Sequence, residues 1–105
     1  MKVEFTASAK LDLQDLRRYV RQFKPPGTWQ IVKEQLRKQV SHLSQFPDAG
    51  AIPDELTGYS AGYRQVMNNQ ERLIYRVTGD TLYVHVICAQ VQDLQEDLLK
   101  RLTRP

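Results

Sequence analysis

Residues 63–77, YRQVMNNQERLIYRV, decide the fold because they contain two strand-like runs separated by a turn. Asn68-Asn69 favours that turn, and Gly79-Asp80 favours a second turn before a further run that ends at residue 89. We therefore expect three strands, at about residues 63–68, 71–78 and 81–89, that pair as an antiparallel meander.

Alternation along residues 71–78 predicts which side chains of this strand face the core. One set is Leu73, Tyr75 and Val77, and the other is Arg72, Ile74 and Arg76. If the first set packs on helices, the arginines face outward, and Arg64 of the preceding strand joins them in a cationic patch that fits a phosphate or a carboxylate. The alternative is a solvated sheet face whose arginines have no particular partner.

The last strand contains a histidine and a cysteine that are candidates for catalysis. Alternation places Leu82, Val84, Val86 and Cys88 on one face and Tyr83, His85 and Ile87 on the other. A histidine can generate a thiolate nucleophile, but this alternation separates His85 from Cys88. We therefore expect a core cysteine and an ordinary strand histidine rather than a catalytic pair.

The N-terminal half predicts a short strand and two helices. Residues 2–6 alternate as a strand, and from Thr6 apolar residues recur at helical spacing. The stripe of the first helix is Leu13, Leu16, Val20 and Phe23, and that of the second, capped by Thr28 and ending near Pro47, is Trp29, Val32, Leu36, Val40 and Leu43. Residues 24–27, KPPG, stop the first helix. The two helices should therefore pack as an antiparallel hairpin.

The remaining segments complete a predicted α+β fold. Residues 47–62 are rich in Pro, Gly and Asp and predict a connecting loop, and residues 91–102 carry Val91, Leu94, Leu98 and Leu102 at the spacing of a closing helix. The predicted order is strand, two-helix hairpin, three-stranded antiparallel meander and C-terminal helix. We expect the helices on one face of a small, mostly antiparallel sheet. The length of 105 residues suits one domain, residues 1–105.

Positive charge is concentrated in the N-terminal half. Residues 1–46 contain nine Lys or Arg and four Asp or Glu, whereas residues 47–105 contain six and eight. This asymmetry favours an acidic or nucleic-acid partner. Arg17, Arg21 and Arg37 on the helices are candidate contacts, although such residues are also typical of the wet side of an amphipathic helix.

Several classes of protein are disfavoured. No apolar stretch approaches the roughly 20 residues of a membrane span, and the N-terminus, MKVEFTASAK, lacks the apolar run of a signal peptide. The single cysteine, Cys88, fits a reducing compartment. His42, His85 and Cys88 lack the spacing of a zinc site. We expect a cytoplasmic protein with no membrane partner, no metal and no cofactor.

The whole chain resembles the RelE/ParE superfamily of bacterial type II toxins. TASAKLDLQDLRRYV (residues 6–20) is similar to the family's first helix, and LRKQVSHLSQFPDAGA (36–51) to its second helix and exit. The family's arginine-bearing hairpin and final strand are similar to YSAGYRQV (59–66) followed by ERLIYRVTGDTLYVHVI (71–87). The family's closing helix is similar to DLQEDLLKRL (93–102). The order and spacing of these segments carry the resemblance.

This resemblance implies a growth-inhibiting toxin that a cognate antitoxin neutralises, in a system for plasmid or genome maintenance. A higher-order toxin–antitoxin complex is compatible with the same resemblance. RelE-like toxins cut messenger RNA on the ribosome, whereas ParE-like toxins bind DNA gyrase and block it. The long helical hairpin, the QFPDAG exit and the YRVTGD turn look more like the ParE branch.

A RelE-like endonuclease needs a set of catalytic residues that this sequence contains only in part. Cleavage of this kind needs cations to stabilise a phosphate and groups to move protons. Arg64 and Arg72 stand where two of the family's cations would be, with His85 as a candidate acid. However, Val66 replaces a basic residue, and AQVQDL follows the last strand where an arginine, histidine or tyrosine is expected.

The favoured interpretation is a gyrase-binding toxin without catalytic residues. The residues expected to bind gyrase or the antitoxin are Tyr63, Arg64, Arg72, Arg76, Arg17, Arg21 and Arg37. The alternatives are a ribosome-dependent endonuclease that uses Arg64, Arg72 and His85, and a decayed toxin that only binds its antitoxin. The sequence leaves the target, the fold of the antitoxin and the stoichiometry open.

Overall fold

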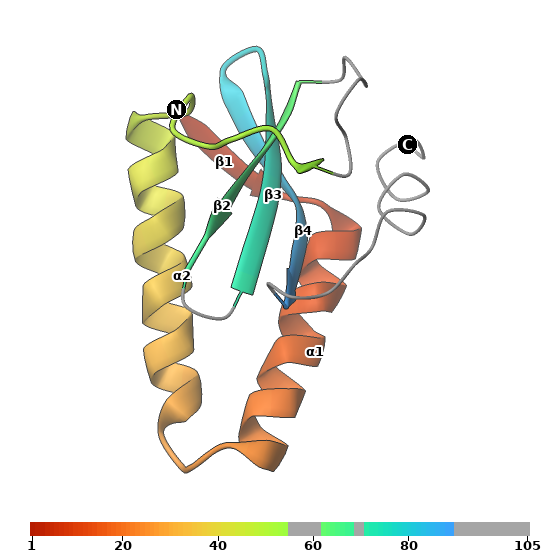
Figure 1. The fold of residues 1–105 in the computed structure, drawn as a ribbon, viewed down its shortest axis with the longest axis vertical. Helices are drawn as coiled ribbons and strands as arrows, with labels where there is room; N and C mark the ends of the chain where they lie inside the picture. The colour runs from red at the N-terminus through yellow and green to blue at the C-terminus, as the bar shows by residue number, and fades with distance from the viewer. Residues whose placement is uncertain (55–61, 69–70, 90–105) are drawn as a thin grey trace.

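The computed structural model describes residues 1–54, 62–68 and 71–89 (Figure 1). The expected C-terminal helix at residues 91–102 lies outside the described residues. The described elements follow the order β1, α1, α2, β2, β3, β4. Each of these six elements was expected from the sequence.

Two long helices form the hairpin. Helix α1 spans Ala7–Phe23, and Thr6 caps it by accepting a hydrogen bond from the Ala9 N–H at 3.1 Å. Helix α2 spans Thr28–Gln45. Its N-cap is Gly27, whose φ of 89° suits glycine, so the expectation that Thr28 is the cap was wrong by one residue. Proline residues 25 and 26 explain the break between the helices.

Four strands form one mixed sheet. Strands β1 (Lys2–Phe5), β2 (Tyr63–Met67), β3 (Glu71–Thr78) and β4 (Thr81–Ala89) lie in the order β1-β4-β3-β2. The pairs β2–β3 and β3–β4 are antiparallel, whereas β1 runs parallel to β4. The predicted α+β class is confirmed.

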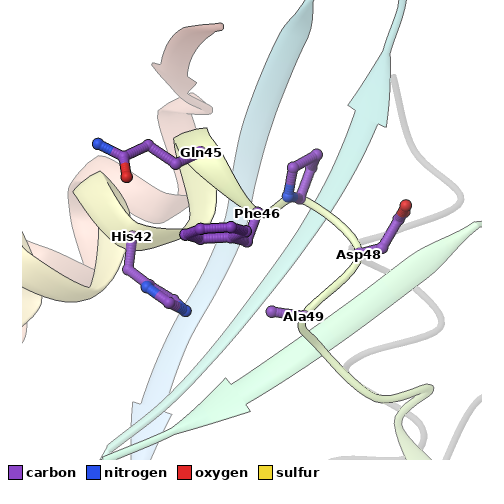
Figure 2. A pocket seen from close by; sticks show the side chains of 6 residues that line it. His42, Gln45, Phe46, Asp48 and Ala49 are labelled. Carbon is purple, nitrogen blue, oxygen red and sulfur yellow. The ribbon is translucent and has the colours of Figure 1, made fainter.

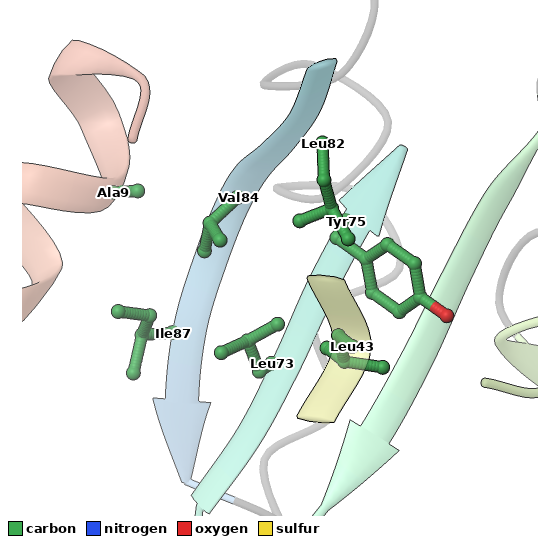
Figure 3. Packing of buried hydrophobic residues seen from close by; sticks show 7 residues of the cluster. All are labelled: Ala9, Leu43, Leu73, Tyr75, Leu82, Val84 and Ile87. Carbon is green, nitrogen blue, oxygen red and sulfur yellow. The ribbon is translucent and has the colours of Figure 1, made fainter. Parts of the chain in front are cut away.

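The main core lies between the helical hairpin and one side of the sheet, which we call the helix face (Figure 3). Ala9 of α1 and Leu43 of α2 pack there with five strand residues, Leu73, Tyr75, Leu82, Val84 and Ile87. Val77 is partly buried against the same cluster. The prediction that Leu73, Tyr75 and Val77 face the helices is therefore confirmed.

A second cluster holds the far end of the hairpin together. It consists of Val20, Trp29, Val32 and Leu36, with Leu13 and Leu16 packed against it. The predicted apolar stripes are thus largely correct. Phe23 is the exception, because 63% of it is exposed instead of being buried between the helices.

A β-bulge in β4 overturns the predicted alternation of this strand. Tyr75 pairs with Val84, but the preceding residue, Ile74, pairs with Val86, so His85 is an extra residue in β4. Beyond the bulge the faces exchange, and Ile87 joins the core cluster. Cys88 pairs with Arg72 on the opposite, outer face of the sheet.

Candidate functional site

Arg64 does not lie with the other two strand arginines. In the pairing of β2 with β3, Arg64 is opposite Tyr75, whereas Met67 is opposite Arg72 and Tyr63 is opposite Arg76. Residues directly opposite each other share a face. Arg64 is therefore on the helix face, and the expected patch of three arginines on one outward face was wrong.

Arg64 and Tyr75 together fasten the turn that follows α2. The Arg64 Nη1 donates to the Gly50 carbonyl at 2.8 Å and lies 3.4 Å from the Asp48 carbonyl. Its Nη2 lies 4.0 Å from the Asp48 carboxylate. The Tyr75 hydroxyl donates to the Pro47 carbonyl at 2.7 Å and accepts from the Gly50 N–H at 3.0 Å. We call these contacts the Arg64–Tyr75 clamp.

The clamp leaves no room for a side chain at Gly50. A Cβ atom there would lie 2.6 Å from the Tyr75 hydroxyl and 2.8 Å from the Gln65 carbonyl. Burial raises the pKa of the Tyr75 hydroxyl, while the Gly50 N–H and the charge of Arg64 act in the opposite direction. This structural role of Arg64 depends on contacts with residues 47–50, so the alternation of its own strand does not reveal it.

Arg72 lies on the outer face but is buried, with 5% of its surface exposed. Its Nη1 donates to Gln65 Oε1 at 3.2 Å. Ile74 and Val86, which pair with each other on the same face, are also buried. The expectation that Arg72 projects into solvent was therefore wrong, although its alternation relative to the core was right.

Arg76 joins an aromatic cluster on the outer face. Its guanidinium carbon lies 4.8 Å from the centre of the Tyr63 ring, a cation–π contact. The Tyr63 ring meets the His85 ring edge-on at 5.2 Å, and the Tyr83 ring lies 6.5 Å from His85. Regular alternation already places His85 on the outer face, and the bulge brings Cys88 to that face as well, so the prediction that His85 and Cys88 lie on opposite faces was wrong.

The helix cations lie in solvent. Arg17, Arg21 and Arg37 are exposed. Arg37 forms two hydrogen bonds with the Glu34 carboxylate, at 3.0 and 2.6 Å, and these lower the pKa of Glu34. Arg17 and Arg21 take part in no ion pair with a described residue.

A shallow hollow opens where α2 ends (Figure 2). It has a volume of about 550 Å³ and is open to solvent. Its lining consists of His42, Gln45, Phe46, Pro47, Asp48 and Ala49. The hollow was not predicted from the sequence, although Phe46 falls outside the apolar stripe of α2, which indicates an exposed ring.

The three residues of the catalytic alternative do not lie on one face of the sheet. Arg64 is bound to main-chain carbonyls on the helix face, while Arg72 and His85 belong to the outer face. Within residues 1–54, 62–68 and 71–89, no three His, Cys, Asp or Glu side chains are placed to hold a metal ion. Neither described helix is long and apolar enough to cross a membrane.

Comparison with known proteins identifies a family. Residues 3–93 match the family described as the ParE toxin of the type II toxin–antitoxin system parDE. The chain is also similar to a solved structure described as the chromosomal ParDE TA system from P. aeruginosa, with a TM-score of 0.68 and 20% identity over 85% of this chain and 95% of that chain. At that identity the likeness to the solved structure shows the fold alone. No curated protein matches the chain.

Proposed function

The chain belongs to the ParE toxins of type II toxin–antitoxin systems, and we propose that it inhibits bacterial growth by binding DNA gyrase. Membership of this family implies a cognate antitoxin as a partner. The proposed inhibition rests on contact between proteins and requires no catalytic residue of the toxin. The proposed site of action is cytoplasmic, where gyrase acts on DNA.

The observation that supports this proposal is the separation of Arg64 from Arg72 by the sheet. An RNA-cleaving site needs its cations and its proton-transferring groups around one phosphate. Arg64 is held by the Gly50 carbonyl on one face, and Arg72 is buried on the other. The placement of these two arginines on opposite faces of the sheet supports a function that does not use them around one phosphate.

The exposed arginines of α1 are available to contact an acidic protein surface. Arg17 and Arg21 are solvent-exposed on α1 and have no carboxylate partner among the described residues. Charges of this kind steer association with an acidic protein surface and fix its orientation. We therefore assign the first contact with gyrase to the helices rather than to the arginines of the sheet.

Purified components provide the test. Relaxed plasmid is incubated with gyrase, ATP and increasing toxin, with and without the cognate antitoxin. We expect toxin to stop the appearance of supercoiled plasmid, and an equimolar amount of antitoxin to restore it. If supercoiling continues at every toxin concentration, the proposal is wrong. Growth arrest with new messenger RNA ends would then identify the endonuclease, and antitoxin binding without growth arrest would identify a decayed toxin.

A further inference from the structure

The turn between α1 and α2 forms an apex that extends beyond the strands of the sheet (Figure 1). We define the apex as residues 16–33. Trp29, Val20 and Val32 are buried there in a cluster separate from the main core. Because the apex has its own apolar interior, it is a preorganised protrusion, and binding through it would need little ordering.

Two aromatic rings are exposed at the end of α1. Tyr19 is 51% exposed and Phe23 is 63% exposed, and their ring centres lie 5.1 Å apart with the planes tilted by 43°. Lys24 Nζ lies 5.9 Å from the centre of the Tyr19 ring. Exposed aromatic side chains with a neighbouring cation are typical of the residues that contribute most to protein binding.

Every charged residue within the apex is positive. Residues 16–33 contain five lysines or arginines and no aspartate or glutamate. Arg18 pairs with Asp15, which lies just before the apex, at 3.2 Å. The surface complementary to the apex is therefore an apolar pocket with carboxylates on its rim.

We infer that Tyr19 and Phe23 enter an acidic-rimmed apolar pocket on gyrase and that Arg21 and Lys24 face the carboxylates of its rim. This inference rests on the proposed function and names the part of the toxin that makes the contact. The tilted rings form a compact knob on a rigid hairpin, which suits a concave protein pocket better than a flat anionic membrane.

Alanine substitutions at the two rings test the inference. Both side chains are exposed and alanine favours helices, so Tyr19→Ala and Phe23→Ala should fold normally. We expect each to raise the toxin concentration for half-inhibition of supercoiling by about 10- to 30-fold, the effect of losing a major contact residue. The matched control is Leu11→Ala, which removes an equally exposed apolar side chain of α1 away from the apex and should change the value by less than about threefold.

Charge reversal tests the acidic rim with the same assay. Arg21→Glu should weaken inhibition, and the loss should shrink as salt is added. Lys10→Glu, a reversal at an exposed position near the start of α1, should have a much smaller effect. Far-UV circular dichroism and thermal melts establish that each variant is folded before its inhibition is compared.

The outcomes separate this inference from the function on which it rests. If the unsubstituted toxin fails to inhibit gyrase, the proposed function is wrong. If the unsubstituted toxin inhibits but the folded ring variants inhibit as well as Leu11→Ala does, the apex is not the contact. Binding to anionic vesicles that depends on Tyr19 and Phe23, with supercoiling inhibition unchanged by their loss, would also overturn the inference.

Discussion

Arg64 and Arg72 show how the role of a residue depends on the face of the sheet that it occupies. Both are arginines of adjacent strands, yet Arg64 hydrogen-bonds the Gly50 carbonyl on the helix face and Arg72 is buried on the outer face. Arg64 thus fixes the turn after α2 instead of presenting a free cation. The buried Tyr75 holds the same turn through the two hydrogen bonds of its hydroxyl.

Tyr75→Phe tests the contribution of the clamp to stability. The substitution keeps the buried ring but removes the hydroxyl that bonds the Pro47 carbonyl and the Gly50 N–H. Leaving buried polar groups without this partner should lower the free energy of unfolding by about 1–3 kcal/mol. Urea denaturation measures the loss, with Tyr83→Phe, a partly exposed tyrosine, as the control. An unfolding midpoint equal to that of the parent would contradict the structural role of the hydroxyl.

Glu71 is a carboxylic acid in surroundings that disfavour its ionised form. Its side chain is at a site with 6% exposure, and desolvation raises the pKa of its carboxyl. An acid with a raised pKa in the folded state is penalised once it ionises. Its contribution is therefore most favourable below the pKa of an unfolded glutamate, about 4.3, and is lost as the pH rises through the folded pKa.

Glu71→Gln should consequently be more stable than the parent at pH 7. The stability gained by the substitution should shrink as the pH falls and vanish near pH 4, roughly where the unfolded glutamate is protonated. Urea denaturation of both proteins at several pH values measures this difference. Glu4→Gln, at an exposed glutamate of β1, is the matched control. A gain that is the same at pH 4 and pH 7 would show that desolvation of the carboxylate is not its cause.

At the scale of the element, the bulge in β4 decides which side chains reach the core. Leu82 and Val84 face the helices, and the extra residue His85 then allows Ile87 to face them as well. A regular strand would have placed Val86 there instead. Beyond the bulge, Cys88 shares the outer face with His85, whose ring contacts that of Tyr63.

Deleting single residues from β4 tests this account. Without His85, Leu82, Val84 and Ile87 would alternate regularly, so the deletion should retain the fold and lose mainly the ring contacts of His85. Deleting Tyr83 from the regular part should turn the fully buried Leu82 to the outer face and abolish cooperative unfolding. Circular dichroism and urea titration compare the two deletions. Equal damage from both would contradict the assignment of His85 as the extra residue.

At the scale of the whole molecule, the sequence predicted the elements and their layers better than the faces of the strands. The helical spacing of apolar residues and the break at residues 24–27 predicted the helical hairpin. The turn residues Asn68-Asn69 and Gly79-Asp80 predicted the last three strands. The parallel pairing of β1 with β4 was not anticipated, because it joins segments about eighty residues apart whose sequences carry no sign of the partner.

The candidate site was predicted less well, for reasons of register. A shift of one residue between two strands moves every side chain to the opposite face, and the pairing of Met67 with Arg72 placed Arg64 opposite Tyr75. The bulge at His85 had the same effect within β4. Neither feature is encoded in the alternation of a single strand, whereas the exposed helix cations followed directly from helical periodicity.

We propose that the toxin acts without cutting RNA, because Arg64 lies on the helix face of the sheet and Arg72 lies on the outer face. The most direct measurement maps messenger RNA 5′ ends in a translating extract that contains purified toxin at a concentration sufficient to stop gyrase. We predict that the pattern of ends matches that of an extract without toxin. New ends at translated codons that disappear when Arg72→Gln replaces the parent would contradict the account.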